Sequence, residues 1–164
     1  MSVQKLIQTL DALSVIHSRL LELGEQKKKY IIKNDIDALM KCANTESRLI
    51  KEIAEIEKQR IHATNYILLE RGLKLNPHIT VSELAKIVTN INDKQSLIAA
   101  SGQLSELLLR LKEINELNQQ LISQSLQFID YSLDLIGGSD DDIIYHNSKQ
   151  QSTLNKRSLF DTKA

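Results

Sequence analysis

The side chains that most often carry catalysis or bind metal ions are few in this sequence and lie far apart. The four histidines form neither a His-x-x-x-His pair nor a Glu-x-x-His unit, the spacings that hold metal in helical bundles; they are His17, His62, His78 and His146. Cys42 is the single cysteine, which excludes an intrachain disulfide, and no sequence partner marks it as a nucleophile. The five glycines form no phosphate-binding loop. We therefore expect no catalysis and no metal or other cofactor.

Charge and hydropathy argue against two further classes of protein, those that bind nucleic acid and those that insert into a membrane. Lys and Arg together number 21, as do Asp and Glu, so the basic face that displaces counterions from nucleic acid is missing. The only basic run, 27–29, is typical of a solvated helix turn. No apolar run approaches the roughly 20 residues of a membrane span, and the N-terminus has no signal-peptide core. We expect a cytoplasmic protein that neither binds nucleic acid nor inserts into a membrane, and the lone cysteine fits a reducing compartment.

The composition favours long helices. Hydrophobic residues make up 41% of the chain but aromatic residues only 4%, so the core must be built from Leu and Ile. Proline occurs once and glycine five times, which leaves few points where the backbone is forced out of a helix. This composition predicts an all-α fold.

Apolar residues at the helical period predict two long helices in the first half, over 2–32 and 36–71. Asn34 and Asp35 separate them, and Asp35 is a good cap for the second helix. Gly72 is expected to end that helix.

After a loop around the single proline, Pro77, the spacing of Thr80 and Glu83 predicts a capping box at the start of a short helix over 81–89. Asp93 is then expected to cap a fourth helix over 94–136, which Gly137 and Gly138 would end.

The length of the fourth helix sets the architecture. At 1.5 Å per residue it is roughly 65 Å long, so it needs long neighbours beside it, and the first two helices supply them. The prediction is an elongated antiparallel bundle of three long helices with one short helix. We expect residues 1–138 to form this bundle domain and 139–164 to form a flexible C-terminal tail, since the tail is rich in Ser, Gln and Asn.

Two asparagines, Asn115 and Asn118, are predicted to project into the middle of the apolar face of the fourth helix. One interpretation is a bundle core whose paired amides fix the register of the helices. The other is a groove for an amphipathic guest helix, in which apolar side chains supply affinity and amides set alignment. A buried amide without a partner costs about 1–3 kcal/mol, so the amides are either paired internally or face a partner.

The stretch 111–129, with Asn115-x-x-Asn118 followed by Leu-Ile and Phe-Ile pairs, resembles the signature segment of the FlgN-type flagellar export chaperones. The spacing of charged and apolar residues over 46–60 resembles the second helix of that family, and so does the upstream helix that ends in Lys33-Asn34-Asp35. The resemblance covers residues 1–136 in order.

The resemblance implies a type III export chaperone for hook–filament junction proteins. Such a protein binds the C-terminal helical segments of its clients in the cytoplasm, prevents premature assembly and delivers the clients to the flagellar export gate. The family's client-binding region maps onto the fourth helix and the tail. The residues expected to bind the client are Leu107, Leu111, Ile114, Asn115, Asn118, Ile122, Leu126 and Ile129. Tyr145 resembles a tail tyrosine implied in docking to the gate, and a tail residue without a role is the alternative.

Two other functions remain open for a helical bundle of this kind. In a self-associating structural coiled coil, a second copy of the chain would cover the same face, giving a homodimer without a client. A bundle enzyme or metal protein would need residues that the motif search does not bring together.

Overall fold

The computed structural model of the 164-residue chain describes the backbone of residues 2–76 and 79–157, and side chains within these ranges up to residue 137. These ranges contain four helices and no strand, which confirms the predicted all-α class with three long helices and one short one. The helices are α1 (Ser2–Lys33), α2 (Ile36–Glu70), α3 (Val81–Ile87) and α4 (Ile91–Arg157). The chain divides into two compact units, Met1–Leu121 and Ile122–Ala164, called unit 1 and unit 2 below.

The turn between α1 and α2 is built by the two predicted cap residues. Asn34 has a positive φ of 55°, a conformation that asparagine tolerates better than most residues. The N–H groups of Asn34 and Asp35 donate to the carbonyls of Ile31 and Tyr30, which satisfies the end of α1. The Asp35 carboxylate accepts from the N–H of Ala38 and so caps the start of α2, as predicted.

The end of α2 also follows the sequence prediction. Gly72 has a φ of +66°, which glycine adopts without steric cost. Its N–H donates to the carbonyl of Leu69, and the N–H of Leu73 donates to the carbonyl of Leu68. This pair of bonds is the Schellman arrangement, which closes a helix through a left-handed residue.

The predicted capping box begins α3. The N–H of Glu83 donates to the Thr80 hydroxyl, and the Thr80 N–H and hydroxyl both donate to the Glu83 carboxylate. The two hydrogen bonds that the Glu83 carboxylate accepts, first the one from the Thr80 N–H and then the one from the Thr80 hydroxyl, hold the pKa of Glu83 below its ordinary value of 4.5.

This lowered pKa gives a pH prediction. A carboxyl group whose pKa is lower in the folded state stabilises the fold above its unfolded pKa, and the contribution is lost as pH falls through the folded pKa. The stabilisation by Glu83 is therefore complete above about pH 4.5 and disappears in more acidic solution. Thr80→Ala removes the hydroxyl but not the backbone donor, so we expect the pKa of Glu83 to rise partway toward its ordinary value. An NMR titration of the Glu83 carboxyl carbon measures this, and an identical pKa in both proteins would contradict it.

Both ends of α4 differ from the prediction. The helix begins at Ile91, because the side chain of Asn90 rather than Asp93 caps it, accepting from the N–H groups of Asn92 and Asp93. The helix also continues through Gly137 and Gly138 to Arg157, so the predicted end at 136 was wrong. Glycine costs a helix only about 1 kcal/mol relative to alanine, and Gly137 lacks the positive φ that ends α2 at Gly72. The flexibility expected for 139–164 stays a prediction, as does the division at residue 138.

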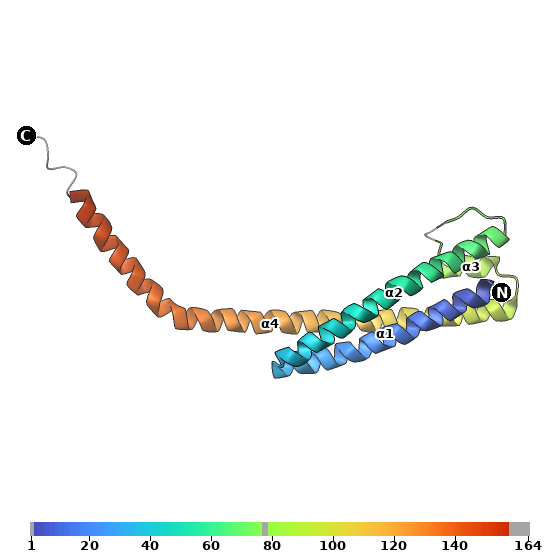
Figure 1. Ribbon diagram of the computed structural model, residues 1–164, viewed down its shortest axis with the longest axis horizontal. Helices are drawn as coiled ribbons and strands as arrows, with labels where there is room; N and C mark the ends of the chain where they lie inside the picture. The colour runs from blue at the N-terminus through green and yellow to red at the C-terminus, as the bar shows by residue number, and fades with distance from the viewer. Residues whose placement is uncertain (1, 77–78, 158–164) are drawn as a thin grey trace, which may run out of the picture. The chain divides into compact units, whose positions relative to one another are not determined.

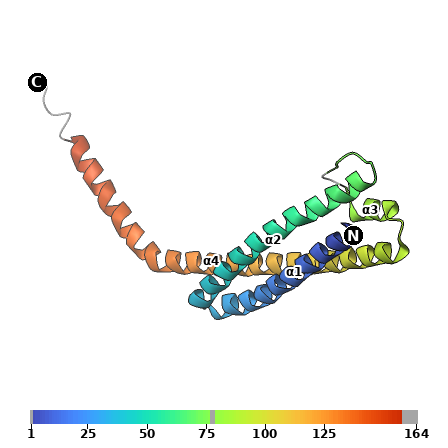
Figure 2. The same ribbon diagram turned by 45° about the vertical axis from the view of Figure 1, so that its right-hand side comes forward.

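Unit 1 is a bundle in which α1, α2 and the first part of α4 lie side by side, as the two views in Figures 1 and 2 agree. α2 runs opposite to α1, and α4 runs in the same direction as α1. One core cluster joins all four helices, and a residue from each is almost fully buried within it. These four residues are Leu6, Leu68, Leu84 and Leu97. The core is aliphatic, as the composition predicts.

A second cluster holds the middle of the bundle and joins Ile16 and Leu20 of α1 to Leu49 of α2. An ion pair adds to this contact, since Lys27 Nζ lies 2.7 Å from Glu46 Oε2. His17 is buried in the same part of α1, and its Nδ1 lies 2.7 Å from the Leu13 carbonyl oxygen. His17 is thus a packed core residue, as expected for a histidine inside an apolar face.

Candidate partner-binding surfaces

A heptad seam connects α4 to the rest of unit 1. Apolar residues recur along it with alternating steps of three and four, the a and d spacing of a coiled coil. We assign Leu97 and every seventh residue after it to position a, and Ala100 and every seventh residue after it to position d. Between Leu97 and Leu121 the side chains of this seam are buried or half-buried: Leu97, Ala100, Leu104, Leu107, Leu111, Ile114, Asn118 and Leu121. Beyond Leu121 the same positions hold Ser125, Phe128, Ser132 and Leu135, and most of these are exposed.

The seam packs closely against α1 at Gly24. A Cβ atom at this position would lie 2.9 Å from Cγ2 of Ile114, so only glycine lets the two helices come this close. One turn further along α4, Asn118 Nδ2 donates to the Gly24 carbonyl oxygen at 2.9 Å. The contact therefore combines an apolar knob with a single interhelical hydrogen bond.

The two asparagines of the sequence prediction have different surroundings. Asn118 is only 2% exposed, and its Oδ1 is buried without a hydrogen-bond partner among the described residues. Asn115 is exposed, so of the two asparagines predicted on the apolar face only Asn118 is buried. The difference arises because three residues turn a helix by about 300°, and only the a position of Asn118 coincides with the seam.

This difference gives a stability prediction. Asn118→Leu loses one hydrogen bond but removes a buried unpaired oxygen and adds apolar surface to the core. We expect the free energy of unfolding to rise by about 1–2 kcal/mol. Asn115→Leu should change it by less than about 0.5 kcal/mol because this side chain is exposed. Chemical denaturation of the two variants measures the effect, and equal changes would contradict the assigned burial.

From Ile122 onward a second set of apolar residues appears on α4, at the b and e positions of the same heptad. We call it the C-terminal stripe; its members are Ile122, Leu126, Ile129, Leu133 and Ile136. Their exposed fractions run from 36% for Ile122 to 75% for Ile136. In unit 1 the last three matching positions hold Lys112, Asn115 and Gln119, and these polar residues separate the stripe from the exposed Leu108. An exposed apolar strip of this length is typical of a binding surface.

Seven of the eight residues predicted to bind a partner fall into two groups, and the eighth, Asn115, is exposed and belongs to neither. Leu107, Leu111, Ile114 and Asn118 belong to the seam of unit 1, where they pack against the chain's own helices. Ile122, Leu126 and Ile129 are exposed members of the C-terminal stripe. What these residues bind stays a prediction. Tyr145 lies outside the residues whose side chains the structure describes.

Three exposed large side chains of unit 2 were not among the predicted partner-binding residues: Phe128, Tyr131 and Leu135, each more than 60% exposed. Phe128 and Leu135 sit at d positions of the heptad, so continuing the seam register past Leu121 would have identified them. Together with the stripe they widen the exposed apolar arc of unit 2.

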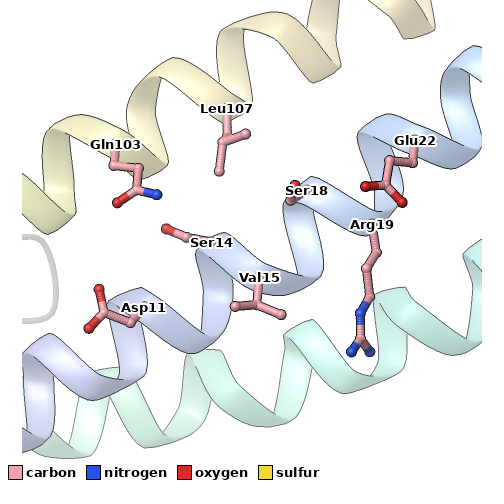
Figure 3. A pocket seen from close by; sticks show the side chains of 8 residues that line it. All are labelled: Asp11, Ser14, Val15, Ser18, Arg19, Glu22, Gln103 and Leu107. Carbon is pink, nitrogen blue, oxygen red and sulfur yellow. The ribbon is translucent and has the colours of Figure 1, made fainter.

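Sequence reasoning also missed a groove between α1 and α4 in unit 1 (Figure 3). The groove has a volume of about 560 Å³. Its walls are six residues of α1 and two of α4: Asp11, Ser14, Val15, Ser18, Arg19, Glu22, Gln103 and Leu107. The short side chains of Ser14 and Ser18 leave the space between the two helices unfilled.

The described part of the chain was also considered for a metal-binding cluster and a membrane-spanning helix, and it contains neither. No group of three or more His, Cys, Asp or Glu residues is placed to hold a metal ion there. Over the same residues, no helix is both long enough and apolar enough to cross a membrane.

Known proteins give two matches to the chain. A family model described as FlgN protein matches residues 1–153. A protein of Bacillus subtilis (strain 168) named "Uncharacterized protein YvyG" is 32% identical over 166 residues, with both chains covered completely. No solved structure matches the chain. The family match spans unit 1 and most of unit 2, including the seam and the C-terminal stripe.

Proposed function

Because this chain belongs to the FlgN family of flagellar export chaperones, we propose that it holds the C-terminal helical segments of hook–filament junction proteins. The match to the family model confirms the resemblance to the FlgN family. The proposed chaperone acts in the cytoplasm, where it prevents premature assembly of its clients and delivers them to the export gate.

The observation that carries this proposal is the C-terminal stripe. Five aliphatic side chains lie on one face of α4 and are exposed to water. A client helix with a complementary strip would remove both surfaces from water, at about 25 cal/mol per Å² of apolar area. Recognition of this kind, a helix packed on an apolar face, uses anchors at the helical period, which the spacing of the stripe supplies.

The polar side chains of the same segment support the proposal. Asp130 borders the stripe beside Leu126 and Leu133, and Asp134 lies further round the helix, which keeps this side of the segment in water. Ser125 and Ser132 occupy a positions, most of which hold leucine in unit 1, so the apolar pattern of the seam is not continued here. An apolar surface bordered by polar residues suits a reversible complex, and a chaperone must release its client.

Calorimetric titration of the full chain with a C-terminal helical segment of a hook–filament junction protein tests the proposal. We expect saturable binding with a negative heat-capacity change, the mark of apolar burial. A titration without binding to any such segment would remove the proposed client class, even though the family membership would stand.

Delivery to the export gate is the second part of the proposal, and Tyr145 is its candidate docking residue. Tyr145→Ala is expected to leave client affinity unchanged and to weaken co-purification with export-gate components. Full retention of the gate components by this variant would exclude Tyr145 as a docking residue.

The C-terminal stripe also supports a second candidate, a homodimer in which another copy covers it. Sedimentation equilibrium of the full chain distinguishes the two candidates. A stable dimer that dissociates on Leu133→Asp would favour self-association, whereas a monomer that binds the client segment would favour the chaperone.

A further inference from the structure

Unit 1 carries a second surface that the C-terminal stripe does not include. We propose that the α1–α4 groove of Figure 3 binds a basic amphipathic helix of another protein. The proposal does not depend on the client-binding function of the stripe, because it concerns different residues in a different unit.

The groove is long enough for a helix. A second hollow of about 240 Å³ continues it between the same two helices, from Leu21 to Lys28 on α1 and from Arg110 to Leu117 on α4. Along each helix the lining residues recur with steps of three and four, so they form one continuous face. From Asp11 to Lys28 the groove follows α1 for about 25 Å, or nearly five helical turns. α1, α2 and α4 thus leave room for the fourth member of a four-helix bundle.

The walls of the groove offer both apolar and polar contacts. Val15 is 54% exposed and Leu107 half-buried, so together they present an apolar surface to a guest. The Ser14 hydroxyl is buried against the groove, and it makes no hydrogen bond with any described residue. A guest side chain that reaches Ser14 would supply the missing partner, which favours a polar residue next to an apolar anchor.

The charges of the groove in Figure 3 favour a basic guest, whereas the second hollow is balanced, with the Lys28–Glu25 ion pair and one charge of each sign on α4, Arg110 and Glu113. Among the described residues, no ion pair or hydrogen bond engages the carboxylates of Asp11 and Glu22, although other acids of α1 and α2 are paired. Figure 3 shows both carboxylates on the side of α1 toward α4, while Arg19 extends away from α4. Eleven residues separate Asp11 from Glu22, about 16 Å along the axis and nearly the same face. Lys or Arg residues eleven positions apart on a guest helix would meet both carboxylates.

Two synthetic peptides test the proposal against the full chain by fluorescence anisotropy. Each is about five helical turns long with the same leucine stripe, and the flanking positions carry lysine in one and glutamate in the other. We expect the lysine peptide to bind at least about 10-fold more tightly, with an affinity that falls as salt rises. Equal affinities for the two peptides would overturn the proposal.

Variants then locate the bound peptide. Asp11→Lys with Glu22→Lys, and separately Val15→Arg, should each weaken binding by about 10-fold or more, since all three residues are exposed and tolerate substitution. Leu109→Arg, at an apolar position 64% exposed outside the groove, is the matched control and should bind as the parent does. Thermal unfolding by circular dichroism verifies that each variant is folded.

Leu133→Asp separates this proposal from the chaperone proposal. It should leave binding of the lysine peptide unchanged, because Leu133 lies in the C-terminal stripe. If Leu133→Asp abolishes peptide binding and the groove variants do not, the groove proposal is wrong and the stripe remains the binding surface. A second copy of the chain that occupies the groove, seen as a dimer broken by Val15→Arg, would equally overturn it.

Discussion

Replacing Ile129 and Leu133 together by aspartate is expected to weaken client binding by about 100-fold or more. Each side chain buries apolar surface worth about 1.5–3 kcal/mol in a complex, and 3 kcal/mol corresponds to more than a 100-fold change in the dissociation constant. Both residues are exposed in the free chain, with fractions of 48% and 60%, so the thermal unfolding of unit 1 should not change. Calorimetric titration with the client segment measures the loss.

The matched control is Gln124→Asp with Gln127→Asp, which adds the same charge to exposed positions outside the stripe. This variant should bind the client within a few-fold of the parent. Equal losses in the two double variants would show that negative charge on α4, rather than the apolar stripe, decides binding, and the stripe would no longer carry the proposal.

Gly24→Ala and Gly102→Ala should have opposite effects on stability. Alanine is favoured over glycine within a helix by about 0.5–1 kcal/mol, and no atom lies within 4 Å of a Cβ placed at Gly102, so that variant should gain this amount. At Gly24 the added Cβ meets the stiff, branched side chain of Ile114 at 2.9 Å, and we expect a net loss of about 1–3 kcal/mol. Urea denaturation of both variants measures the two signs.

A double-mutant cycle with Ile114→Ala identifies the cause of the loss. Ile114→Ala alone should cost about 2–5 kcal/mol, because it leaves a cavity against α1. In the double variant, the methyl group added by Gly24→Ala enters part of the cavity left by Ile114→Ala. Its free energy of unfolding should therefore exceed the value expected from the sum of the two single losses by at least about 1 kcal/mol. Additive losses would show that the close contact with Ile114 is not the source of the cost.

The caps were predictable from sequence because their causes are local. Asp35, Gly72 and the Thr80–Glu83 box each act within a few residues of the chain, and the structure contains all three. Helix ends without such a local signal were less predictable. Asn90 and Asp93 are both good caps, and the choice between them depends on where the loop after α3 lets the helix begin. Gly137 weakens a helix but does not by itself end one.

The candidate surfaces were harder to predict because apolar residues cover a wide arc of α4. Leu104, Leu108 and Leu111 all fit a helical stripe, but only Leu104 and Leu111 lie on the seam, and Leu108 is exposed. Which part of the arc is buried depends on the positions of α1 and α2, and one sequence does not contain that information. The same holds for the α1–α4 groove, because Ser14 and Ser18 resemble ordinary surface residues until Gln103 and Leu107 are placed opposite them.

Because α4 runs parallel to α1, its contacts with α1 close much longer loops of the chain than the contacts between α1 and α2 do, and the entropic cost of docking differs accordingly. The Lys27–Glu46 pair between α1 and α2 joins residues 19 apart, whereas the Asn118–Gly24 hydrogen bond joins residues 94 apart. Closing the longer loop costs about 1.4 kcal/mol more, since the cost grows as the logarithm of loop length. Undocking α4 therefore recovers more configurational freedom than opening the α1–α2 hairpin. Among the long helices of unit 1, α4 is therefore the one whose docking is opposed most strongly by the entropic cost of loop closure.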